Sequence, residues 1–102
     1  MERKVLLFSA MKDKDYRLVL RLLGREIDLA IVTQVSLGRS AGLLELGKAA
    51  RAAGMRVKGV KNPKKALAQA KKLAGKRGAV FIAGSIYLLA GLFGKDRAKI
   101  AQ

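Results

Sequence analysis

Residues 79–94 read Ala-Val-Phe-Ile-Ala-Gly-Ser-Ile-Tyr-Leu-Leu-Ala-Gly-Leu-Phe-Gly, and this stretch decides the fold. Its first five residues form an unbroken apolar run, which predicts a strand buried on both faces. Gly84-Ser85 then makes the turn, and Ser85 is a suitable N-cap for an almost wholly apolar helix over residues 86–93. A bilayer-spanning helix needs about 20 apolar residues, so this broken run predicts no membrane segment. A strand and a helix of this kind indicate the interior of an α/β domain.

The chain is strongly basic and lacks two reactive residue types. Its 102 residues include 22 Lys+Arg against 7 Asp+Glu, a formal charge of +15, which favours polyanions or acidic ligands as partners. The sequence has no Cys and no His, which excludes disulfides, thiol or imidazole catalysis and the usual metal sites, and no metal ligand is assigned. The N-terminus shows no signal-peptide pattern, so we expect a cytoplasmic location.

The remaining sequence alternates strand and helix patterns with short connections. Further strands are predicted at 5–8, 29–33 and 55–60, and helices at 16–23, 43–53 and 63–74. The segment 55–60 alternates polar and apolar residues and is therefore placed at a sheet edge. Alternation of this kind gives a parallel sheet with helices on both faces. We expect one domain, a three-layer α/β/α sandwich over residues 1–94, followed by a polar tail at 95–102.

Helix boundaries are marked by capping residues. Asp13 or Asp15 is placed to cap the helix at 16–23, and Gly24 closes that helix as its C′ residue. Asn62-Pro63 opens the helix at 63–74 with an N-cap and a proline at the first helical position.

Short segments at the ends of three predicted strands carry a family resemblance: Asp13-Lys14-Asp15, Thr33 and Gly84-Ser85-Ile86-Tyr87-Leu88. Together they resemble the C-terminal domain of folylpolyglutamate/dihydrofolate synthases, ATP-dependent glutamate ligases of the Mur ligase superfamily. The resemblance runs from about residue 5 to residue 92. It implies a Rossmann-like domain that closes over an ATP-binding central domain, with four parallel strands in the order 4-1-2-3.

The resemblance also implies roles for four residues. Lys14 and Ser85 would face the carboxylates of the incoming glutamate, and a cation and a hydroxyl at strand carboxyl ends suit that task. Arg39 matches the arginine of the loop after the second strand, and Tyr87 shapes the same pocket. Each has an ordinary alternative: Lys14 and Arg39 as solvated charges, Ser85 as an N-cap, and Tyr87 as part of the core.

Departures from the family limit what this chain does alone. The family's nucleotide-contacting Asp-Gly-Ala-His-Asn-Pro motif and the P-loop are both absent from this sequence. Ser9 stands where the family prefers Gly, and Ala90-Gly91 replaces the usual Gly-Glu. We therefore expect no ligase activity and no bound cofactor from this chain alone, with ATP and Mg²⁺ belonging to a complete family member.

The family's sheet has one more strand, beside the one predicted at 80–83. Without it, residues 80–83 become an apolar edge, with the helix at 86–93 beside it. We expect a homodimer across a two-fold axis, or the missing ligase domain, to cover this edge, and no membrane partner.

The charge supports a second hypothesis, a nucleic-acid-binding protein, with RNA as the partner. No acid occurs between residues 48 and 77, as is typical of phosphate-backbone contacts. The residues assigned to this polyanion patch are Lys48, Arg51, Lys64, Lys65, Lys71, Lys72, Lys76 and Arg77. An aromatic content of 5% argues against base stacking. The alternative is a solvated surface that keeps the protein soluble.

Overall fold

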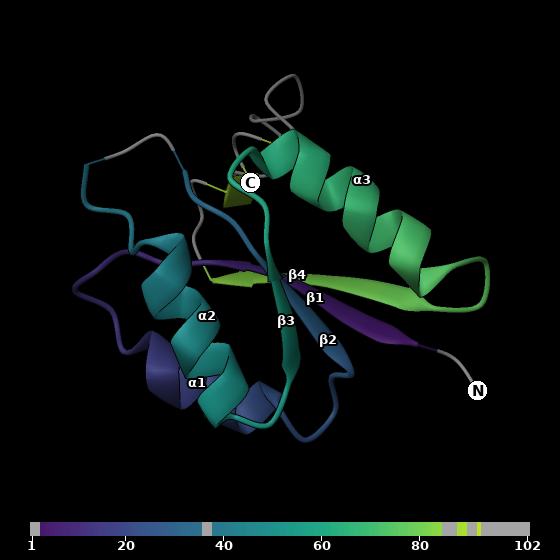
Figure 1. Ribbon diagram of the computed structural model, residues 1–102, viewed down its shortest axis with the longest axis horizontal. Coiled ribbons are helices and arrows are strands. Elements are labelled where there is room, and N and C mark those ends of the chain that lie inside the picture. The colour runs from purple at the N-terminus through teal and green to yellow at the C-terminus, as the bar shows by residue number, and fades with distance from the viewer. Residues whose placement is uncertain (1–2, 36–37, 85–87, 90–91, 93–102) are drawn as a thin grey trace, which may run out of the picture.

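The computed structural model describes residues 3–35, 38–84, 88–89 and 92. Strands and helices alternate along them: β1 (Lys4–Ser9), α1 (Tyr16–Leu23), β2 (Leu29–Val32), α2 (Leu43–Ala52), β3 (Arg56–Gly59), α3 (Pro63–Ala74) and β4 (Ala79–Gly84) (Figure 1). These residue ranges confirm the four predicted strands and the predicted helices at 16–23, 43–53 and 63–74. Of the helix predicted at 86–93, the described residues Leu88, Leu89 and Leu92 are helical. The predicted tail at 95–102 lies outside the described residues.

The four strands form one parallel sheet in the order β3-β2-β1-β4, which is the predicted order read from the other edge. β1 and β2 occupy the middle, and β1 is buried at every position after Lys4. β3 lies at an edge, as its alternating sequence predicted. β4 lies at the other edge, as the predicted strand order placed it. Its side chains are exposed or half-buried, and Phe81 is 46% exposed, so the prediction that this strand is buried on both faces is wrong.

The helices form two outer layers. Because side chains alternate along a strand, Leu6 and Phe8 point to one face of the sheet, where they cluster with Leu20 of α1 and Leu46 of α2. Val5 and Leu7 point to the opposite face. α1 and α2 therefore cover one face and α3 the other, which confirms the three-layer sandwich (Figure 1).

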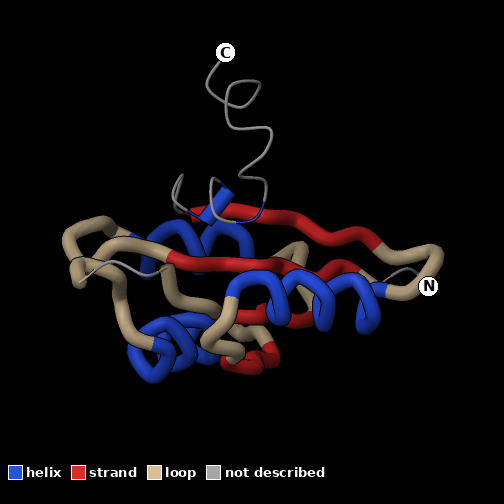
Figure 2. Tube along the Cα trace, turned by 90° about the horizontal axis from the view of Figure 1, so that it is seen from above, coloured by secondary structure: helices blue, strands red, loops and turns tan. Residues whose placement is uncertain are grey.

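α3 packs through small side chains and presents its lysines to solvent. Ala66, Ala70 and Ala74 are buried against the sheet, and fully buried Leu88 joins the same cluster. Figure 2 shows α3 crossing in front of the strands. Asn62 caps the helix as predicted, because its side chain accepts a hydrogen bond from Lys65 N at 3.1 Å.

The two ends of α1 are held differently. Asp15 is the N-cap, since its carboxylate accepts from Leu18 N at 3.3 Å, which decides between the two predicted caps. Gly24 ends the helix but keeps a right-handed backbone with φ −58°, so its assignment as a C′ residue is wrong. A Cβ at Gly24 would overlap the carbonyl oxygen of Ala53, so glycine is required by the close approach of α1 to the end of α2. No helix in the described part of the chain is long and apolar enough to cross a membrane.

Candidate functional site

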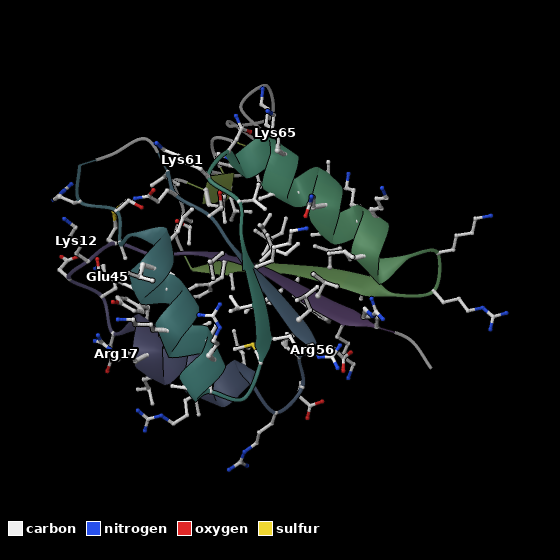
Figure 3. All side chains as sticks on the ribbon, viewed as in Figure 1. Lys12, Arg17, Glu45, Arg56, Lys61 and Lys65 are labelled. Atoms are coloured by element: carbon white, nitrogen blue, oxygen red, sulfur yellow. The ribbon has the colours of Figure 1, made fainter. Side chains whose placement is uncertain are left out.

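The loops that follow the strands gather at one end of the sheet. In an open parallel sheet this is the end where ligands bind. Figure 3 shows Lys12 and Lys61 toward this end of the molecule, whereas Arg56, at the start of β3, lies toward the opposite end.

Backbone hydrogen bonds join the loop after β1 to the loop after β2. Lys12 N donates to Arg39 O at 2.8 Å, and Ala41 N donates to Ala10 O at 2.8 Å. Lys14 is held in the same turn, since its N–H donates to Met11 O at 3.2 Å. The structure thus places Lys14 and Arg39, two of the predicted site residues, on loops that are tied together, and both side chains are exposed.

A buried threonine connects the ends of β2 and β3. Thr33 is fully buried, and its hydroxyl donates to Lys61 O at 3.1 Å. Beside this bond lies a hollow of about 500 Å³ lined by Gln34, Val35, Lys61, Asn62 and Pro63. No site role was predicted for Lys61. A cation directly ahead of the Asn62 N-cap opposes the helix dipole, and this unfavourable position was a usable signal.

The end of β4 presses closely on the end of β1. Gly84 has φ +105°, and a Cβ there would overlap the carbonyl oxygen of Ser9. The Ser9 hydroxyl is buried and has no hydrogen-bond partner among the described residues. Ser85 and Tyr87, the other two predicted site residues, lie outside the described residues.

The charge of this end of the sheet suits an anion. Its exposed cations are Lys12, Lys14, Arg39 and Lys61. The described acids at this end are Asp13, Asp15 and Glu45, and Asp15 is engaged in capping α1. No three His, Cys, Asp or Glu side chains in the described ranges are grouped so that they could hold a metal ion. The geometry therefore fits a carboxylate or phosphate ligand better than a cation.

The residues assigned to the polyanion patch lie on both sides of the sheet. Lys48 and Arg51 belong to α2, which covers one face. Lys64, Lys65, Lys71 and Lys72 belong to α3 on the opposite face, followed in the chain by Lys76 and Arg77. All eight are exposed, but the structure divides them between two surfaces.

A second cationic hollow lies between α1 and α2. It has a volume of about 440 Å³ and is lined by Arg17, Arg21, Glu45, Lys48, Ala49, Ala52 and Ala53. The sequence indicated the shared face of Arg17 and Arg21 through their four-residue spacing, but it did not bring Lys48 next to them.

No family model matches this chain, and no curated protein sequence matches it significantly. Solved structures of FolC and of folylpolyglutamate synthase share its fold. The chain is similar to E. coli FolC in complex with DHPP and ADP, with a TM-score of 0.83 and 19% identity. It is also similar to Mycobacterium tuberculosis folylpolyglutamate synthase complexed with ADP, with a TM-score of 0.73 and 21% identity.

These matches confirm the predicted resemblance at the level of the fold. Each covers 98% of this chain, but only 23% of the FolC chain and 24% of the M. tuberculosis chain. The chain therefore has the fold of one part of these proteins and spans about a quarter of their length.

Proposed function

We propose that this chain is the glutamate-holding C-terminal domain of a folylpolyglutamate synthase-like ATP-dependent ligase, and that it has no ligase activity alone. The observation that carries the proposal is the fold shared with FolC over 98% of the chain. The joined loops that present Lys14 and Arg39 at the ligand-binding end of the sheet support it. A cytoplasmic location is part of the same proposal.

The proposal assigns nucleotide and Mg²⁺ to the rest of the complete ligase. ADP is present in the similar FolC and M. tuberculosis structures. In this chain, Asp15, which adjoins Lys14, already accepts a hydrogen bond from the α1 backbone. A Mg²⁺ ion prefers carboxylate and phosphate oxygens, and the described charges at this end of the sheet are four cations and three acids, one of which caps α1.

Thermal unfolding in L-glutamate tests the proposal. At ten times its dissociation constant, a ligand that binds only the folded state stabilises it by about 1.4 kcal/mol, or several degrees in Tm for a domain of this size. Sodium acetate at equal ionic strength is the control for charge screening. The double variant Lys14→Gln/Arg39→Gln should lose the shift, and Lys71→Gln on α3 should keep it. Equal shifts in glutamate and acetate would contradict the proposal.

Nucleic-acid binding is the second candidate, favoured by the charge of +15 and by the exposed lysines of α3. Filter binding of mixed RNA and DNA at 50 and 200 mM salt separates the two candidates. Phosphate contacts through α3 would give binding that falls steeply with salt and weakens in Lys64→Gln/Lys71→Gln. Absence of binding at both salt concentrations would remove this candidate and leave the glutamate proposal intact.

A further inference from the structure

The outer side of α1 and the adjoining face of β4 carry large apolar side chains that stay exposed. Leu18 is 43% exposed, Val19 40%, Leu22 69% and Phe81 46%. We call Val19, Leu22 and Phe81 the α1–β4 face. Isolated exposed apolar residues are common on protein surfaces, whereas a contiguous group of them marks an interaction site.

Topology and register place Val19 and Leu22 on the side of α1 away from α2, and Phe81 on the α1 side of the sheet. Phe81 is the register partner of Leu6, and Leu6 clusters with Leu20 of α1, so Phe81 lies on the α1 side of the sheet. Arg17 and Arg21 line the hollow shared with α2. At 100° per residue, Val19 and Leu22 lie on the side of α1 that is turned away from Arg17 and Arg21.

α2 packs on β2 and β3, so the free side of α1 is the side toward β4. Among the described residues β4 is hydrogen-bonded to β1 alone, which leaves its outer backbone groups without a strand partner. Natural edge strands are usually protected by a lysine, a proline or a bulge. β4 reads Ala-Val-Phe-Ile-Ala-Gly and has none of these. The edge therefore has both the backbone groups and the apolar side chains to pair with another strand.

We propose that a second copy of this chain covers the α1–β4 face, with the two β4 strands antiparallel across a two-fold axis normal to the sheet. Such an axis keeps both α1 helices on the same side of the joined sheet. Val19, Leu22 and Phe81 of one copy then face the same residues of the other. This interface lies on the α1 side and needs no residue of the predicted helix at 86–93.

The charge distribution favours a second copy over an acidic partner. None of the three residues of the face is charged, and neither is any residue of β4, in a chain of net charge +15. An acidic partner would find no cation to pair with on the face itself. Two copies bring no like charges into direct contact there, and their long-range repulsion is screened over about 8 Å at 0.15 M salt.

Sedimentation equilibrium of the full chain tests this inference independently of glutamate binding. At tens of micromolar we expect a mass twice the 11.0 kDa of one chain. Raising the salt from 0.1 to 0.5 M should strengthen the association, because it screens the repulsion and favours apolar burial. A single species of 11.0 kDa at 100 μM in 0.5 M salt would overturn the proposal.

Charge-insertion variants locate the interface. Phe81→Lys should weaken the dimer at least tenfold, because each copy would bury a lysine near the axis. Leu44→Lys is the matched control, since Leu44 is 70% exposed on α2 and lies outside the face. If circular dichroism shows that Phe81→Lys has lost its fold, Leu22→Lys on the exposed side of α1 decides instead. The proposed interface would be contradicted if Leu44→Lys weakened the dimer equally. It would also be contradicted if the folded variant of the face, Phe81→Lys or else Leu22→Lys, left the dimer unchanged.

Discussion

The two edges of the sheet share a backbone architecture and differ in how they are protected. β3 presents Arg56 and Lys58, both exposed, along its outer edge. β4 presents no charge between Ala79 and Gly84. Charged residues on an edge strand oppose pairing with another chain, because their burial and mutual repulsion are costly. The comparison indicates that β3 is protected against pairing with another chain, whereas β4 is able to pair with a strand of a partner.

The close contact at the end of β4 gives the largest expected effect. Gly84→Ala forces an L side chain to φ +105° and overlaps the Ser9 carbonyl, so unfolding should become easier by about 3 kcal/mol. Gly59→Ala, at the corresponding end of β3, meets Leu43 and Val32 at ordinary distances and should change stability by less than about 1 kcal/mol. Urea unfolding of both variants measures the difference. Equal losses would show that the two edges are equally constrained.

Removing the charges of β3 should let this edge strand pair with another chain as β4 does. Arg56→Val/Lys58→Val leaves an uncharged β-branched edge, and roughly tenfold stronger association through β3 is expected. With both edges able to pair, association should continue past the dimer, which light scattering detects as larger species. Lys64→Val/Lys71→Val on α3 removes the same charge elsewhere and should leave the mass unchanged. A double β3 variant whose mass equals that of the wild type would show that these cations do not protect the edge.

Element positions were predictable from the sequence because local signals agree with the fold. The alternating pattern of β3 and the Asn62-Pro63 start of α3 each specify a boundary on their own. The edge position of β4 was predictable from the strand order, whereas the exposure of its side chains was not, because an apolar run does not show whether helices cover the strand.

The candidate site was predictable in part. The Lys14 and Arg39 loops meet because β1 and β2 are neighbouring parallel strands. The polyanion patch was predicted from the absence of acids between residues 48 and 77, but its residues lie on opposite faces of the sheet. The connection from β3 to β4 runs back across the sheet, so its right-handed crossover places α3 on the face opposite to α2. Gly24 was misassigned because its requirement comes from the distant Ala53, which no local pattern reveals.

Amide hydrogen exchange at two protein concentrations compares the edges most directly. We expect the outward-facing amides of β4 to exchange several-fold more slowly at 200 μM than at 2 μM, because a second copy pairs with them only at the higher concentration. The amides of β3 should exchange at the same rate at both. Rates for β4 that are independent of concentration, or slowing that is equal in β3 and β4, would contradict the claim that β4 is the edge through which this chain meets its partner.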